Sequence, residues 1–229
     1  RRAREIERLL ERTRFCVDLH QTIEPCGTPF FIFAYDEHHL RFAQSIATDL
    51  PVVTYRGNQF STLNTGLTLY EFVARIGGVG IGVELGQKGF GFYSEAVGLK
   101  VALGAIATMK ALAAGNDLPE LSGTANPLYP WQAVVPYPEG NVALDDGLFN
   151  FQAITRGQRL GMDGDQPIVA PASGALLFPK YVRSPDEPRP PELYRLMRRV
   201  YLADLAAPVE GAGSPVRPQA PFDGERHAR

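Results

Sequence analysis

Short apolar runs separated by turn-forming residues dominate the beginning of the chain. Residues 15–33, FCVDLHQTIEPCGTPFFIF, predict a strand, a turn at Pro25-Cys26-Gly27 and a second strand. Apolar residues at helical spacing predict helices at 1–14 and 35–50, and PVVTY at 51–55 predicts another short strand. This alternation of helices and strands is typical of an α/β domain.

The middle of the chain continues the α/β pattern. We expect a surface loop at 57–68, a short helix at 69–76 and a glycine-rich strand, GGVGIGVE, at 77–84. No phosphate-binding glycine motif is present, so the glycines favour close approach of another backbone. Residues 94–114 predict a long helix, capped by Ser94 and packed against the sheet because it is apolar on most sides.

The pattern changes after a linker rich in proline and glycine at 117–130. Short strands are predicted at 132–137 and 149–154, and two more lie around a turn at Ser173-Gly174, so we expect a small antiparallel β module. The segment 157–179 resembles part of a lipoyl-like barrel, but it has Ser-Gly where a carrier would present lysine. A last amphipathic helix is predicted at 191–204, and residues 206–229 are expected to be disordered.

Composition excludes several classes of function. The 229 residues are 45% hydrophobic with a net charge of −2, which gives ample material for a core and no basic field for nucleic acid or a membrane surface. No apolar run long enough for a membrane span and no signal peptide is evident. Cys16 and Cys26 are expected to be reduced thiols of a cytoplasmic protein. The chain begins without Met, and we expect it to be part of a longer protein.

Two strand ends carry the candidate chemistry. Asp18 and His20 end the first strand, and ligands in α/β proteins collect at the carboxyl ends of strands. His20 is either a zinc ligand or a hydrogen-bonded structural histidine. Glu84 ends the glycine-rich strand and is either a proton-transfer group or a surface or capping acid. The adjacent His38 and His39 are either a metal-binding pair or, as we expect, surface residues of a first helical turn.

Two motifs, DLHQT at 18–22 and GIGVELGQKGFG at 80–91, together with the order of the predicted elements, resemble the aspartoacylase and succinylglutamate desuccinylase family of zinc-dependent amidohydrolases. This family is related to the zinc carboxypeptidases, and the resemblance covers about residues 1–181. It implies a zinc-carboxypeptidase-like α/β fold with a mixed sheet and flanking helices, followed by a small C-terminal β domain. The implied domains are 1–125, the C-terminal part of the catalytic domain, 126–182, a β-rich domain, and 183–229, a helix and tail.

The resemblance also implies the chemistry. His20 would be the third ligand of Zn²⁺ and Glu84 the general acid/base, with zinc-bound water attacking the amide of an N-acyl amino acid. From its position, we expect Asp18 to orient either the end of the sheet or a ligand without binding the metal itself. The family's other two zinc ligands, a His and a Glu in an HxxE pattern, do not precede His20 in this sequence, nor does its Asn-Arg segment. We therefore expect the parent protein to be the enzyme and this piece to be inactive alone.

A carboxylate-bearing substrate would need a cation. Arg75 lies near the position of the family's substrate-binding arginine, and Arg56 and Lys88 are further candidates, each with a surface charge as the alternative. Tyr181 is at the end of the β module and within possible reach of the site. Two other functions stay open: a carboxypeptidase-like or other zinc deacylase, and a metal-free binding protein of the same fold. A homo-oligomer is compatible with all three.

Overall fold

The computed structural model describes residues 2–34, 36–54, 68–121, 127–182 and 188–201. The helices are α1 Arg2–Leu10, α2 Glu37–Ile46, α3 Leu69–Arg75 and α4 Phe92–Ala113. The first strands are β1 Phe15–Thr22, β2 Phe30–Ala34, β3 Val52–Thr54, β4 Val79–Gln87, β5 Leu128–Pro136 and β6 Val142–Leu144. The remaining strands are β7 Ala153–Ile154, β8 Arg159–Asp163, β9 Gln166–Val169, β10 Gly174–Leu177 and β11 Glu192–Met197.

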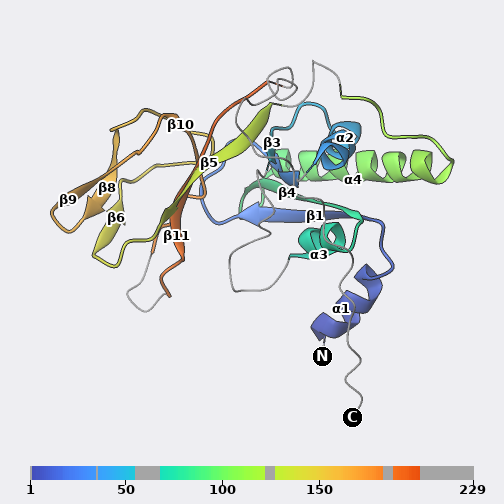
Figure 1. Cartoon of the computed structure of the whole chain (residues 1–229), viewed down its shortest axis with the longest axis horizontal. Coiled ribbons are helices and arrows are strands. Elements are labelled where there is room, and N and C mark those ends of the chain that lie inside the picture. The colour runs from blue at the N-terminus through green and yellow to red at the C-terminus, as the bar shows by residue number, and fades with distance from the viewer. Residues whose placement is uncertain (1, 35, 55–67, 122–126, 183–187, 202–229) are drawn as a thin grey trace, which may run out of the picture.

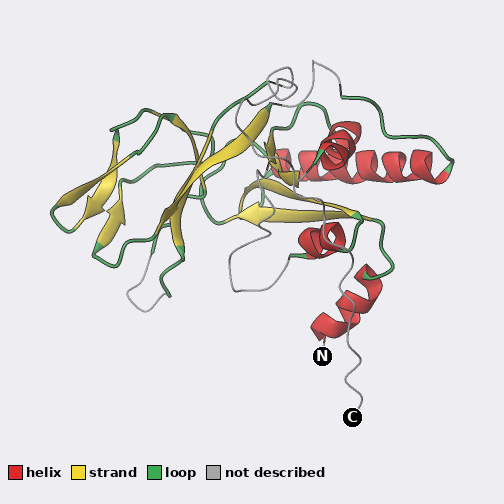
Figure 2. Ribbon diagram, viewed as in Figure 1, coloured by secondary structure: helices red, strands yellow, loops and turns green. Residues whose placement is uncertain are grey.

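One mixed sheet runs through the molecule in the order β1-β4-β2-β3-β5-β11-β10-β7, and a smaller sheet has the order β6-β8-β9. Within the described residues β1 and β4 are parallel and β2 runs antiparallel to β4. In Figure 1 the helices gather around the β1 side of the large sheet, and the β-rich part extends to the other side. The predicted α/β fold with a mixed sheet, flanking helices and a C-terminal β part is confirmed (Figure 2).

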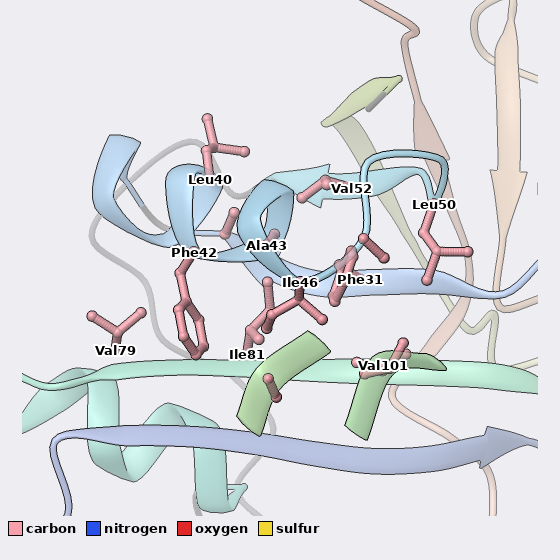
Figure 3. Packing of buried hydrophobic residues seen from close by; sticks show 14 of the residues in the cluster. Phe31, Leu40, Phe42, Ala43, Ile46, Leu50, Val52, Val79, Ile81 and Val101 are labelled. Atoms are coloured by element: carbon pink, nitrogen blue, oxygen red, sulfur yellow. The ribbon is translucent and has the colours of Figure 1, made fainter. Parts of the chain in front are cut away.

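Alternation along the strands supplies both faces of the sheet with apolar side chains. On one face α2 and α4 pack on β2, β3 and β4, and Figure 3 shows Phe31, Phe42 and Ile81 converging there. On the other face α3 lies against β1 and β4 (Figure 1), and its Tyr70 packs with Phe30 and Ile32 of β2. Helices therefore pack on both faces of the sheet at β4.

The glycines of β4 allow α3 to approach. A Cβ at Gly80 would overlap the backbone oxygen of Tyr70, and one at Gly82 would lie 2.8 Å from the Tyr70 ring. This confirms the predicted close approach of a second backbone, and it holds Tyr70 over the face that bears Asp18 and Glu84.

The long helix α4 differs from its prediction. Its N-cap is Gly91, with no side-chain cap, so Ser94 does not cap it. Only Val97, Val101, Ala105 and Thr108 are buried, whereas Leu99 and Leu103 are 62% and 58% exposed. The helix packs on α2 and the sheet through one stripe because α2 and β4 reach only that side. Within the described residues α4 is also the one helix whose length and composition would suit a membrane span, which is weak evidence by itself.

The predicted helix at 191–204 is wrong. Residues 192–197 form β11, which pairs antiparallel with both β5 and β10, and all six residues are buried. Because side chains on both faces of β11 are buried, its composition does not show the alternation of a half-buried strand. Residues 202–229 lie outside the described part, as does the predicted loop from 57 to 67.

The β part carries a core of its own, with Leu160, Leu176 and Leu193 fully buried. A third cluster joins β2 and β3 residues to Ala175, Leu177 and Met197 of β10 and β11. Of the predicted domain boundary, residues 122–126 lie outside the described part, and β5 begins at Leu128. The division at 125/126 stays a prediction.

Candidate active site

The ends of β1 and β4 bring His20 and Glu84 side by side. The two strands are parallel, and His20 is the register partner of Glu84, as Asp18 is of Gly82. Register partners in neighbouring strands direct their side chains to the same face of the sheet. The two strongest candidates from the sequence therefore share one face and one edge.

Asp18 holds the His20 ring. The distance from Asp18 Oδ1 to His20 Nε2 is 2.9 Å, and the side chains are 13% and 47% exposed. A carboxylate on one ring nitrogen fixes the tautomer with the proton there and leaves the lone pair on the other nitrogen, here Nδ1. His20 thus has the orientation and the exposure that a metal ligand needs.

Glu84 is a buried acid. Its residue exposure is 8%, and its Oε2 atom is buried without a hydrogen-bond partner among the described residues. Burial raises the pKa of Glu84 from 4.5 to about 7; the charge of His20 opposes this rise, and Glu24 adds to it. A carboxyl group with this pKa changes protonation state near neutral pH, as a proton-transfer group must.

The β part contributes a lysine to the same edge. Lys180 Nζ lies 2.7 Å from Glu24 Oε1, and Glu24 is itself buried. Both charges act on the pKa of Glu84. The sequence alone does not predict Glu24 and Lys180 as site residues, because their contact joins positions 156 residues apart. The only local signal was an acid directly before the Pro25 turn that follows DLHQT.

The other cations from the sequence analysis are placed differently. Arg75 ends α3 and is exposed beside the amino end of β4, away from Glu84, so the structure does not bring it to the site. Lys88 is exposed at the His20 edge, where its backbone N–H donates to Thr22 O. Arg56 lies outside the described residues.

Tyr181 serves the β part. Its hydroxyl donates to Asp145 O and accepts from Leu148 N, each at 3.0 Å. These bonds fix a loop of the small β module, and no described contact joins Tyr181 to His20 or Glu84. The structure gives Tyr181 a structural role.

The remaining candidates are also structural. Cys16 and Cys26 are free thiols, as predicted, and burial raises the pKa of Cys16 to about 11, which keeps it protonated. His39 is buried on α2, not a surface residue as predicted, and its Nδ1 lies 2.7 Å from Oδ1 of Asp36, the N-cap of the helix. His38 is exposed, as expected.

The donor set tests whether zinc fits. Among the described residues no group of three or more His, Cys, Asp and Glu side chains is arranged to hold a metal ion. His20, oriented by Asp18, fits as one ligand, and Glu84 is a buried acid beside it whose Oε2 atom has no hydrogen-bond partner among the described residues. The described part of the chain therefore offers one candidate ligand and one buried acid, which is less than a complete zinc site.

The sequence matches no protein-family model and no curated protein. Solved structures match it at low identity. Succinylglutamate desuccinylase from Vibrio parahaemolyticus is 17% identical with a TM-score of 0.59, over 86% of this chain and 60% of its own. Murine aminoacylase 3 is 16% identical with a TM-score of 0.58, over 88% of this chain and 70% of its own.

A third match is the ectoine utilization protein EutE (DoeB) from Ruegeria pomeroyi, 20% identical with a TM-score of 0.53, over 86% of this chain and 64% of its own. These neighbours include the desuccinylases to which DLHQT and GIGVELGQ pointed, and at such identities the likeness is one of fold. The chain spans about 60% of the length of the desuccinylases it matches.

Proposed function

We propose that this chain is part of a zinc-dependent deacylase that hydrolyses the amide bond of an N-acyl amino acid. The observation that carries the proposal is the register pairing of His20 with the buried Glu84, whose Oε2 atom has no hydrogen-bond partner among the described residues. The fold shared with desuccinylases and an aminoacylase supports this choice of reaction.

Glu84 acts as the general acid/base. As a carboxylate it accepts a proton from the attacking water while the water oxygen bonds to the amide carbonyl carbon. It then gives that proton to the amide nitrogen as the C–N bond breaks, so the products are a carboxylic acid and an amine. Burial raises the pKa of Glu84 and a cation beside it would lower it, and these opposing effects suit a side chain that both accepts and gives a proton.

His20 would hold the metal through Nδ1, with Asp18 fixing the ring from the other nitrogen. Zinc supplies a Lewis acid that polarises the carbonyl and lowers the pKa of water. The other ligands would come from a part of the parent protein that this chain does not contain. We therefore expect the 229-residue chain alone to lack deacylase activity.

The experiment is elemental analysis of the parent protein, extended upstream of Arg1, with three variants. We expect about one zinc per chain in the wild type, loss of zinc in His20→Ala and retention in His38→Ala, an exposed histidine away from the site. Glu84→Gln should keep its zinc and lose about 10²–10⁴-fold in the rate of amine release from N-acyl amino acids.

A metal-free binding protein is the second candidate, favoured by the incomplete ligand set among the described residues. It predicts no zinc in the extended wild type and micromolar or weaker binding of N-acyl amino acids without turnover. Zinc that is present and unaffected by His20→Ala would contradict both candidates, because the metal would then lie elsewhere.

A further inference from the structure

We propose that Lys180 is a positioning residue of the candidate site: its ion pair with Glu24 fixes the segment 22–26 and through it the direction of His20. The functional meaning of this proposal rests on the proposed role of His20 as a metal ligand. The geometry is independent of that role, because every contact involved is present in the chain itself.

The Glu24–Lys180 contact is the first link. Glu24 Oε1 and Lys180 Nζ are 2.7 Å apart, and the side chains are 9% and 29% exposed. A pair so little exposed is weakly screened, and Glu24 would be a buried charge without its cation. Lys180 is itself anchored, because its backbone N–H donates to Leu193 O in β11 at 2.8 Å. The backbone that carries the Lys180 side chain is thus fixed to a strand of the β core.

Asn150 is the second link and holds the same segment from the same side. Its backbone N–H donates to Pro25 O at 3.0 Å, and its Oδ1 accepts from Phe178 N at 2.6 Å. Asn150 is 2% exposed and forms an isolated parallel bridge with Cys26. Two neighbouring points of the turn after β1, Glu24 and Pro25, are therefore fastened to the β part.

The third link leads back to His20. Thr22 Oγ1 donates to Glu24 O at 2.7 Å, and Thr22 O accepts from Lys88 N at 2.7 Å. Between His20 and Thr22 the register of β1 against β4 shifts. An irregularity of this kind re-aims the side chains beside it, so the direction of His20 depends on where the following residues are held.

A merely structural ion pair would stabilise the β part and leave His20 unchanged, and NMR separates these cases in the 229-residue chain. The chain has only four histidines, so the ring resonance of His20 is assigned with His20→Ala. Hydrogen exchange of the Lys88 and Asn150 amides reports on the Thr22 and Pro25 carbonyls that they bond.

We expect Lys180→Met and Glu24→Gln each to shift the His20 resonance and to speed exchange of both amides about tenfold. Lys180→Arg, which keeps the ion pair, should restore the wild-type values. Arg159→Met, which breaks the exposed pair with Asp145 in the same β part, is the matched control and should change neither readout. The double variant Glu24→Gln/Lys180→Met leaves no unpaired buried charge. It can be measured in place of a single variant that does not fold, with the same expected changes in the His20 resonance and amide exchange.

Unchanged amide hydrogen exchange in both single variants would overturn the proposal. A shift of the His20 resonance in Lys180→Met but not in Glu24→Gln would also overturn it, because the shift would then report the lost charge of Lys180 and not a change in the segment 22–26. The readouts need no zinc, so a failure of the zinc proposal leaves this result intact. In the extended enzyme, Lys180→Met should lower kcat about tenfold with KM within about twofold. A rise in KM alone would instead assign Lys180 to substrate contact and contradict a positioning role.

Discussion

His20 and Glu84 are directly opposite each other on two parallel strands, and the hydrogen-bonded register of β1 and β4 fixes this relationship. Neighbouring strands lie about 4.8 Å apart, so the spacing of the two backbones is set by the sheet and not by a flexible loop. Groups placed on rigid elements keep the geometry that proton transfer near a metal requires.

Glu84→Gln should change how stability depends on pH. The pKa of Glu84 is about 7 in the folded chain and 4.5 at its ordinary value. Between these values the folded chain keeps a proton that the unfolded chain has released, so raising the pH favours unfolding. Relative to the Gln variant, the wild type should lose up to about 3 kcal/mol of unfolding free energy between pH 4 and pH 8.

Urea unfolding at a series of pH values measures this difference directly. The Gln variant removes the titrating carboxyl group while keeping the shape of the side chain, so the difference between the two proteins isolates the effect of the charge. Parallel stability curves for the two proteins would show that folding leaves the pKa of Glu84 unchanged, and would contradict the raised value.

Gly80→Ala should destabilise the fold by about 3 kcal/mol, because a Cβ there overlaps the Tyr70 backbone and α3 must move away from β4. Gly27→Ala is the matched control. A Cβ at Gly27 meets nothing within 4 Å, so this change should be neutral or slightly stabilising. Thermal or urea unfolding of both variants checks the difference, and equal stabilities would contradict the close approach of α3.

Arg195→Met should cost about 3 kcal/mol of unfolding free energy. Arg195 Nε lies 2.9 Å from both carboxylate oxygens of Glu192, and its guanidinium is 4.0 Å from the centre of the Trp131 ring. Removing the cation leaves Glu192 buried and unpaired. Glu192→Gln/Arg195→Met should recover most of the loss, whereas a double variant as unstable as the single one would locate the cost in lost packing.

Tyr181→Phe should lower the unfolding free energy by about 1–2 kcal/mol, because the hydroxyl joins Asp145 O and Leu148 N. Tyr93→Phe, at an exposed tyrosine of α4, should change it by less than about 0.5 kcal/mol. In the extended enzyme Tyr181→Phe should leave KM and kcat near the wild-type values. A tenfold loss of kcat without a loss of stability would contradict a purely structural role and assign Tyr181 to the active site.

Local sequence patterns were sufficient for the elements that build the edge of the site. The strands around DLHQT and GIGVE, the turn between β1 and β2 and helix α3 all follow from short-range periodicity and breakers. The segment of β11 predicts a helix because Leu193, Leu196 and Val200 also fit a helical spacing. Its pairing with β5 and β10 makes it a strand instead. Tertiary pairing overrides propensity at such a segment.

The site itself was only half visible in the sequence. Asp18, His20 and Glu84 lie in motifs at strand ends, where α/β folds collect their chemistry. Lys180, Glu24 and Asn150 meet through contacts between the two parts of the fold, and no local pattern marks a partner 156 residues away. Arg75 was favoured by its distance from Glu84 along the chain, but that distance spans most of β4 and leads to its opposite end.

β5 has a mechanical consequence for how substrate would enter. The strand pairs with β3 through Leu128 and Pro130 and continues directly into its pairing with β11 at Trp131. A hinge needs a segment whose backbone angles can rotate freely, and rotation within β5 would break hydrogen bonds on both sides of the turning point. The two parts should therefore move as one body, and access to His20 and Glu84 should be gated by side chains and loops at the strand ends.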